Sequence, residues 1–479
     1  MEFTREEEEE MIAPVSPTGY YFNSSVLNIC VVGVLEFELP IDDSKAITLL
    51  QHLFLPINPR FSSIMIEEKN GKKQWKKVDV NLKNHIKTPT FPPKKSPKYY
   101  EKCLDKYLSE LSTQELPQTQ PLWEIHVIKY PTTNSSGTVI FKIHHALGDG
   151  YSLMGALLSC LQRAENPNLP LTFPFVSTLP VNNIFNAGGG VNNNGVFKSL
   201  PKILSSIFNT VSDFSWSVVK SSFLEDDVTP IRSGDPGVES RPLSISTMSF
   251  SLKDIGIIRA NLGVSVNDVI TGTVFLGTRL YMQAMDEESR NANSTALILL
   301  NTRMFRGYKS IEEMIKTNSK SPWGNHFAFL HISIPKLTDN LELHPFMFGK
   351  IAQETIKKKR SSLAVYLTAA LLEAVKKFRG PEEASKLVHS TLKNTSMVIT
   401  NVIGPMEKMA LDVQPIKGLY FMATGNPQNL TVTIVSYMGE LRVAIGAEKG
   451  FIDTHKLKSF IENAFQMILK SASNIPENN

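Results

Sequence analysis

The residues best suited to chemistry in this 479-residue chain lie in one short segment, His-His-Ala-Leu-Gly-Asp-Gly at 144–150. A β-prone apolar run at 138–143 precedes it, and a helix-like apolar run at 152–161 follows it. Successive side chains of a strand point to opposite faces, so His144 and His145 are expected to face different surroundings. The pattern places histidine chemistry at the end of a strand, just before a turn and a helix.

Four interpretations of this segment are possible. Two satisfied core histidines beside a turn would have no chemical role, which is common for histidine. A zinc site needs three or four convergent ligands, and the sequence has neither an H-E-x-x-H segment nor paired C-x-x-C motifs. A serine nucleophile would favour a G-x-S-x-G elbow, which the sequence also lacks. The remaining chemistry is a histidine general base that deprotonates a hydroxyl or thiol of one substrate for attack on an activated acyl group of another.

The segment resembles the H-H-x-x-x-D-G motif of CoA-dependent acyltransferases, and other blocks are similar to motifs of the plant-type wax ester synthase/diacylglycerol acyltransferase family. These blocks follow the family's order and together cover nearly the whole chain. They are Pro14–Gly19, Pro59–Ser63, Pro121-Leu122-Trp123, Ser265–Val269 with its Asn-Asp pair, Asn401–Pro405 and Gly425-Asn426-Pro427.

The resemblance implies an α/β (mixed α+β) fold with the two-domain architecture of chloramphenicol acetyltransferase and a long crossover linker. Alternating elements in the first third of the chain agree with a mixed fold. Strands are expected at 27–37 and 123–129, and helices at 44–53 and 99–111.

The resemblance also implies roles for the residues of the motif. His145 would be the general base, and His144 would serve in packing or in orienting the site. Asp149 would hold the turn structurally, with Arg303 as a candidate partner for its carboxylate. Gly150 would let the chain leave the turn without a Cβ clash.

Other residues outside the motif are weaker candidates. Asn267 would stabilise an oxyanion or line the channel, although either it or Ser265 could instead cap a helix. Pro121 and Trp123 would shape the channel wall or the core. The basic run at 357–360 could meet CoA phosphates or lipid head groups, but a solvated helix face explains it more simply.

The implied activity is transfer of a fatty acyl group from acyl-CoA to a long-chain alcohol, to diacylglycerol, or to both. Acyl-CoA would be a co-substrate, with no bound cofactor, no metal and no covalent acyl-enzyme. Two alternatives stay open. One is a catalytically idle lipid-binding scaffold of the same fold. The other is an alcohol acyltransferase of another branch, marked by a D-F-G-W-G segment; the only echo here, at 213–217, lacks both glycines and lies mid-chain.

Changes in composition predict the domain organisation. Residues 1–13 read as a disordered acidic tail, and 14–164 as an N-terminal acyltransferase domain carrying the motif. Several prolines and a Gly/Asn-rich stretch then mark 165–243 as the crossover linker. A second series of strands and helices, 244–479, forms the C-terminal acyltransferase domain. Within the linker, 197–218 is a candidate amphipathic helix.

This candidate helix carries Phe197, Phe208 and Phe214 on one face with several aliphatic residues. Asn209 and Asp213 interrupt the best apolar window, so an in-plane interfacial helix fits better than a transmembrane one. A helix that packs its apolar stripe on the protein itself is an equal alternative.

Composition bounds the partners and the compartment. A net charge of +4 is too small to argue for nucleic acid. Three scattered cysteines suit a reducing compartment, and the acidic start is unlike a secretory signal. The lipid substrates imply a membrane surface. We therefore expect the cytosolic face of the endoplasmic reticulum membrane, with the plasma membrane as a second location, and no secretion.

Overall fold

The computed structural model describes residues 11–68, 72–172, 224–301, 323–340, 344–362 and 364–474. The candidate amphipathic helix at 197–218, the D-F-S-W-S echo at 213–217 and Arg303 lie outside these residues. Strand β1 (Met11–Pro14) begins within the stretch expected to be an acidic tail.

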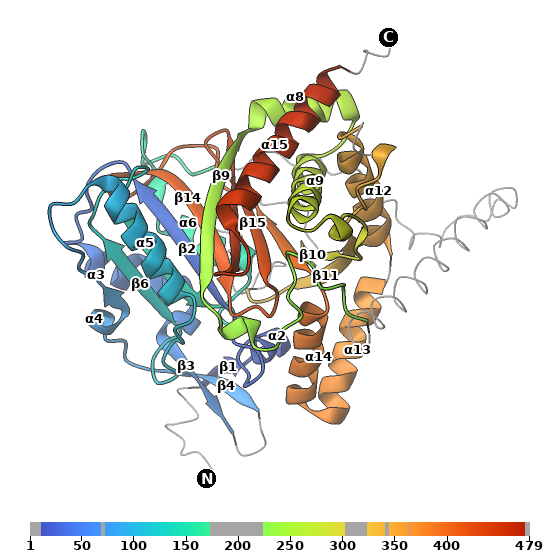
Figure 1. The fold of residues 1–479 in the computed structure, drawn as a ribbon. Coiled ribbons are helices and arrows are strands. Elements are labelled where there is room, and N and C mark those ends of the chain that lie inside the picture. Colours follow the sequence, from blue (N-terminus) through green and yellow to red (C-terminus); the bar gives the residue numbers. More distant parts are fainter. Residues whose placement is uncertain are drawn as a thin grey trace, which may run out of the picture.

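Two large sheets organise the molecule (Figure 1). The seven-stranded sheet has the order β5 (Ile86–Lys87), β6 (Trp123–Ile128), β7 (Gly137–His144), β2 (Cys30–Phe37), β14 (Gln414–Thr424), β13 (Met409–Leu411), β8 (Gln162–Arg163). The six-stranded sheet has the order β11 (Phe327–Ser333), β10 (Thr295–Asn301), β12 (Met397–Val402), β15 (Leu430–Tyr437), β16 (Glu440–Glu448), β9 (Leu243–Ser251). A small third sheet joins β1, β4 (Lys73–Lys77) and β3 (Ser63–Glu67).

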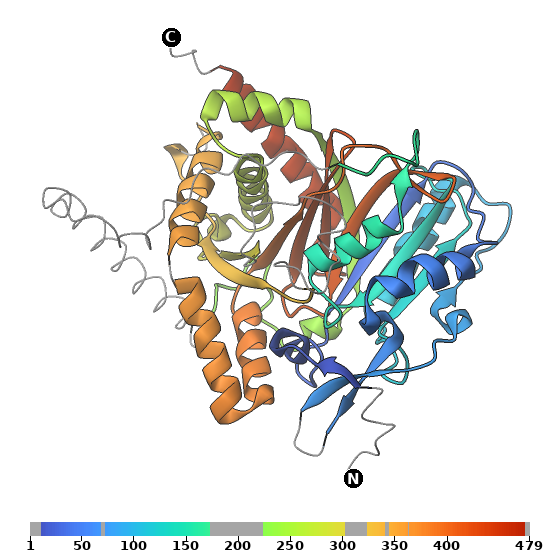
Figure 2. The ribbon, with the colours of Figure 1, turned by 180° about the vertical axis from the view of Figure 1, so that it is seen from behind.

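The second half of the chain completes the first sheet. Strand β14 lies antiparallel to β2 along its length, with Thr424 opposite Cys30 and Ile416 opposite Phe37. Figure 2 shows this segment entering the blue and cyan half of the molecule from the C-terminal half. The two halves therefore share a sheet, and their relative placement is tied to backbone hydrogen bonds.

Helices cover both faces of the seven-stranded sheet. Helix α5 (Pro97–Leu111) packs on one face, where Val32 and Val34 of β2 meet its leucines. On the opposite face lie α6 (Gly150–Ser159) and η1 (Leu50–Phe54), a π-helical turn that continues α3 (Ala46–Leu49). Alternation along β2 explains the division, because neighbouring side chains of a strand point to opposite faces.

The six-stranded sheet packs against α8 (Leu252–Leu262), α9 (Val266–Met285), α12 (Met347–Ser361) and α15 (Thr454–Ser473), with α9 between the last two (Figure 1). Two glycines allow α9 to approach its neighbours closely. A Cβ on Gly277 would lie 2.6 Å from the Ile461 Cα in α15, and one on Gly272 would lie 2.5 Å from the Gly349 backbone nitrogen in α12. The remaining helices α13 (Ala364–Arg379) and α14 (Pro381–Lys393) pack on each other.

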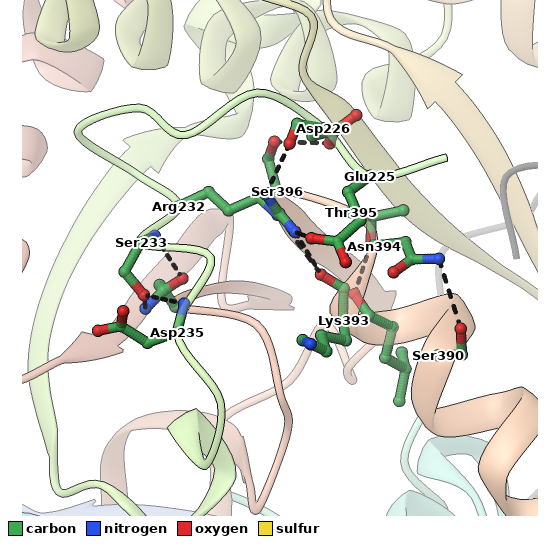
Figure 3. Close-up of polar contacts among 12 residues, drawn as sticks. Glu225, Asp226, Arg232, Ser233, Asp235, Ser390, Lys393, Asn394, Thr395 and Ser396 are labelled. Atoms are coloured by element: carbon green, nitrogen blue, oxygen red, sulfur yellow. Dashed lines mark hydrogen bonds and ion pairs between the residues drawn. The ribbon is translucent and has the colours of Figure 1, made fainter. Parts of the chain in front are cut away.

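The end of the crossover is fixed between β10 and β12 (Figure 3). The Asp226 carboxylate accepts hydrogen bonds from the Thr295 backbone N–H at 2.7 Å and from the Ser396 hydroxyl at 2.6 Å. Buried Arg232 donates to the Asp226 carbonyl oxygen at 2.6 Å and pairs with Glu225. These bonds tie the chain that returns from the crossover to the second sheet, ahead of β9.

The expected elements around the motif are present. The predicted strands correspond to β2, β6 and β7, and the predicted helices at 99–111 and 152–161 to α5 and α6. The predicted helix at 44–53 is α3 followed by the π-helical turn. Among the described residues, no helix is both long enough and apolar enough to cross a membrane.

Candidate active site

His145 follows the last residue of β7 and lies where the two halves of the molecule meet. Its backbone N–H donates to the Ile29 carbonyl oxygen at 2.9 Å, which extends the pairing of β7 with β2 by one residue. His145 is 8 % exposed, and its imidazole packs against two phenyl rings that also contact each other. The ring centroid of Phe22 lies 4.7 Å away and that of Phe327 lies 5.6 Å away.

Asn325 makes two hydrogen bonds with His145. The Asn325 side-chain nitrogen donates to the backbone carbonyl oxygen of His145 at 2.8 Å, and the Asn325 Oδ1 atom faces the imidazole Nδ1 atom at 2.8 Å. A carbonyl oxygen can only accept, so the amide nitrogen must face it. The amide oxygen therefore faces Nδ1, and Nδ1 must carry the proton.

This arrangement leaves Nε2 of His145 with the lone pair. No other described residue hydrogen-bonds to Nε2, and Nε2 is not among the fully buried side-chain atoms that lack a partner. Burial lowers the pKa of His145 below its usual value, opposed by the Asp149 carboxylate and by the bond to Asn325. A lowered pKa favours a neutral imidazole near pH 7, with its lone pair on Nε2.

His144 has a different environment. Its side chain is fully buried, its Nε2 bonds to the Asn28 Oδ1 atom at 2.8 Å, and its Nδ1 accepts the Ala146 backbone N–H at 3.0 Å. Burial lowers the pKa of His144 to about 3, with the neighbouring imidazole of His145 as a further cause. With both nitrogens occupied, His144 has no free position for proton transfer.

The Gly-Asn-Pro block lies beside Asn28. Gly425 has a φ of +81°, and a Cβ there would lie 2.1 Å from the Asn28 carbonyl oxygen. Only glycine fits this approach of the loop after β14 to the residue that binds His144.

Asp149 caps α6 and also bridges the two halves. Its Oδ1 accepts the Ser152 backbone N–H at 3.0 Å, and its Oδ2 accepts the His326 backbone N–H at 2.9 Å. Asp149 therefore also holds the turn at 323–326, since His326 lies 177 residues further along the chain.

The turn at 323–326 is fastened to the motif at several points. The Trp323 indole N–H donates to the Leu147 carbonyl oxygen at 2.7 Å. The Gly324 carbonyl oxygen accepts from the Asp149 backbone N–H at 3.2 Å and from the Ser152 hydroxyl at 3.1 Å. Asn325 was not among the residues predicted from the sequence. The only signal was a Trp-Gly-Asn-His string before a strand, and nothing local links that string to the motif.

Gly150 packs closely against the second sheet. Its φ is not positive, and a Cβ there would lie 3.2 Å from Val402 Cγ2 at the end of β12.

Asn267 lies in the first turn of α9, whose cap is Ser265 in a capping box with Asp268. The Asn401 amide donates to Asn267 Oδ1 at 3.4 Å. Because Val402 follows Asn401, these contacts link Asn267 to the start of α6.

The P-L-W segment lies in the core beside the motif. Trp123 is fully buried, donates its indole N–H to the Phe61 carbonyl oxygen at 2.9 Å and stacks on His85. Pro121 is buried, and the Leu122 carbonyl oxygen accepts the His144 backbone N–H at 2.9 Å. The segment thus supports the strand that carries the histidines.

An apolar cavity of about 70 Å³ begins at Gly150. It lies between α6 and the adjoining face of the sheet, and Gly150 and Cys160 at opposite ends of α6 both line it. At a rise of 1.5 Å per residue, this helix spans about 15 Å. Its wall includes Gly33, flanked by Phe141 and Phe421 on the neighbouring strands.

The basic run at 357–360 forms the last turn of α12, where positive charge is favourable beside the helix C-terminus. Among the described residues, no group of three or more His, Cys, Asp or Glu is placed to hold a metal ion.

The shared sheet joins the two halves in a mixed α/β, two-domain fold of the chloramphenicol acetyltransferase-like class, as the sequence predicted. Solved structures share this fold. The wax ester synthase/diacylglycerol acyltransferase from Marinobacter aquaeolei VT8 aligns with a TM-score of 0.59 at 16% identity, over 96% of this chain and 100% of that chain. The first condensation domain of the calcium-dependent antibiotic synthetase aligns with a TM-score of 0.55 at 13% identity, over 93% of this chain and 92% of that chain.

Sequence comparison identifies the family. The wax ester synthase/diacylglycerol acyltransferase catalytic domain matches residues 51–270, and the WS/DGAT C-terminal domain matches residues 323–469. Wax ester synthase/diacylglycerol acyltransferase 11 of Arabidopsis thaliana is 29% identical over 95% of this chain and 94% of its own length. Wax ester synthase/diacylglycerol acyltransferase 4 of the same plant is 27% identical over 97% of this chain and 90% of its own length. The chain belongs to the wax ester synthase/diacylglycerol acyltransferase family and is an acyltransferase, as the motifs predicted.

Proposed function

We propose that the chain transfers a fatty acyl group from acyl-CoA to the hydroxyl of a long-chain alcohol, of diacylglycerol, or of both, with His145 as the general base. One observation carries the mechanism: hydrogen bonding fixes the imidazole with its lone pair on Nε2, the nitrogen that no described residue occupies. Family membership supplies the substrate classes.

The step needs no protein nucleophile. Nε2 of His145 accepts the proton of the acceptor hydroxyl while its oxygen attacks the thioester carbonyl carbon, and a tetrahedral oxyanion forms. When the oxyanion collapses, the C–S bond breaks, and the imidazolium returns the proton to the departing CoA thiolate. General-base assistance of this kind contributes roughly 10²–10⁴-fold to a rate.

Asn267 is our candidate for the oxyanion or the acyl carbonyl. Its Oδ1 is engaged by Asn401, so its amide nitrogen is directed away from that bond and keeps its two N–H groups as donors. Asn267 contacts Asn401 in β12, and the next residue, Val402, lies against Gly150, the last residue of the motif and the first of α6. A donor at this position would stabilise negative charge that develops on the thioester oxygen.

We further propose that part of the alkyl chain of one substrate enters the cavity along α6, whose volume of about 70 Å³ takes a short stretch of that chain. The described wall is apolar, and the cavity starts at Gly150, the last residue of the motif. Removal of apolar surface from water favours such a chain by about 0.8 kcal/mol per CH₂.

The decisive experiment incubates the purified protein with labelled palmitoyl-CoA plus hexadecanol or dioleoylglycerol. Formation of wax ester or triacylglycerol supports the proposal, and the ratio of the two products assigns the preferred acceptor. Tight lipid binding without ester formation by a folded protein would instead support an idle scaffold.

We also propose docking on the cytosolic face of the endoplasmic reticulum membrane, because both acceptor classes reside in bilayers. The proposal rests on the apolar stripe predicted at 197–218. Replacement of Phe197, Phe208 and Phe214 together by Ser should abolish flotation with liposomes, while activity on short, water-soluble alcohols survives. Unchanged flotation would show that this stripe does not dock.

A further inference from the structure

We infer that Asn325 is a positioning residue of the reaction: it fixes the neutral tautomer in which His145 can act as a base. This inference rests on the proposed role of His145. An imidazole that loses its Nδ1 partner divides between two neutral tautomers, and the one with a proton on Nε2 cannot accept the proton of a hydroxyl. Asn325 removes that alternative, because its Oδ1 atom, 2.8 Å from Nδ1, can accept a hydrogen bond only when Nδ1 carries the proton.

The orientation of the Asn325 amide is itself fixed. If the amide rotated by half a turn, its nitrogen would face Nδ1 and its oxygen would face the carbonyl oxygen of His145, two acceptors in contact. The side chain is 7 % exposed, so water is poorly placed to relieve that contact. The backbone carbonyl of His145 thus determines, through Asn325, the protonation pattern of the His145 ring.

The rigidity of the turn makes this control effective. Residues on both sides of Asn325 bind the motif, since the Gly324 carbonyl oxygen accepts from the Asp149 backbone N–H at 3.2 Å and the His326 backbone N–H donates to the Asp149 carboxylate. Phe327, which follows in β11, packs against the same imidazole. The amide is therefore held in place by the second half of the chain, whereas the base belongs to the first.

Two substitutions separate positioning from structural support. Asn325→Leu removes both hydrogen bonds at similar volume, so kcat should fall roughly 10- to 100-fold, within the range that a general base supplies, while the KM for acyl-CoA changes less than about twofold. Asn325→Asp keeps an acceptor for Nδ1 but loses the donor to the His145 carbonyl oxygen, so it should retain more kcat than the leucine variant and melt at a lower temperature than the native protein.

The aspartate variant should also move the pH profile. An anion beside Nδ1 favours the imidazolium. Among the described residues, the Asp149 carboxylate already acts on the His145 imidazole, the His144 imidazole adjoins it, and Arg60 and His326 lie beside Gly324, next to Asn325. Because His145 must be neutral to act, the acid limb of kcat/KM should move to higher pH in Asn325→Asp. A carboxylate introduced out of contact with the imidazole would not shift this limb.

A matched control is Asn429→Leu. Asn429 is also buried, and its amide nitrogen donates hydrogen bonds to the side chains of Ser233 and Glu448. It lies just before β15, outside the site. This variant should lose thermal stability without a change in kcat or in the acid limb. An Asn325→Leu variant that behaves like this control would overturn the inference.

A spectroscopic arm keeps the test independent of turnover. NMR of isotope-labelled histidine nitrogens reports which ring nitrogen carries the proton, and the His145 signals are those lost in His145→Gln. We expect a proton on Nδ1 in the native protein and a mixture of tautomers in Asn325→Leu. If the native protein makes no ester, the proposed function fails while this arm still decides the role of Asn325. A native Nε2–H tautomer, or an unchanged tautomer in Asn325→Leu, would refute it.

Discussion

Neutralising Asp149 should weaken the connection between the two halves of the site more than it weakens the cap of α6. In Asp149→Asn, one amide oxygen can still accept the Ser152 N–H, and asparagine is about as good a helix cap as aspartate. The amide nitrogen would then face the His326 N–H, which loses its acceptor. A partly buried N–H without a partner costs about 1–3 kcal/mol. At roughly 2–4 °C per kcal/mol for a domain of this size class, we expect the melting temperature to fall by roughly 2–12 °C.

The control for this prediction is Asp453→Asn. Asp453 caps α15 by accepting the Lys456 N–H at 3.0 Å, and it is exposed. Its substitution should leave the melting temperature within a degree or two, because only the capping bond is involved. Thermal melting by circular dichroism and ester formation would be measured on both variants. Equal melting curves for the two would refute the bridging role of Asp149, whereas a loss of about 3–5 kcal/mol would indicate that a buried cation also pairs with it.

Three further predictions concern the histidines and the cavity. His145→Ala should lose about 10²–10⁴-fold in ester formation and stay folded, whereas His144→Ala should keep more activity and melt at a lower temperature; the reverse ranking of activities would contradict the assignment. Gly33→Leu should shift relative kcat/KM from palmitoyl-CoA towards octanoyl-CoA, because a Cβ there meets no atom within 4 Å and the larger side chain would enter the cavity; an unchanged preference would place the acyl chain elsewhere. The free energy of unfolding should fall as pH drops below about 6.5, because the pKa values of His144 and His126 are lowered to about 3 and about 4 in the folded protein while the unfolded chain binds protons near 6.5; equal urea midpoints at about pH 7.5 and about pH 5 would exclude this.

The sequence predicted those parts of the fold that local pattern determines. The strand, motif and helix around His145 follow from apolar periodicity over a dozen residues on each side. The place of β14 beside β2 does not, since it joins residues almost four hundred positions apart, and both strands would read as apolar in either sheet. The boundary predicted near residue 243 divides the chain in sequence. The first sheet nevertheless includes strands from both sides of it, because β14 pairs with β2.

The candidate site shows the same limit. His145 and Asp149 could be found from their own motif, whereas Asn325 lies 180 residues from the histidine that it binds. Asparagine is frequent in turns for reasons unrelated to chemistry, so its type alone carries little information. Only the three-dimensional pairing distinguishes it from the other asparagines of the chain.

The two adjacent histidines differ in how many ring nitrogens the protein has already engaged. Asn28 and the Ala146 backbone together occupy both nitrogens of His144, whereas Asn325 occupies one of His145. The residue that selects the base thus comes from the second half of the chain. A fragment that ends near residue 164 would keep the motif but lose Asn325, together with β14 from the middle of its sheet. On the proposed mechanism, the motif alone therefore does not make a competent base, and the two halves together form the catalytic unit.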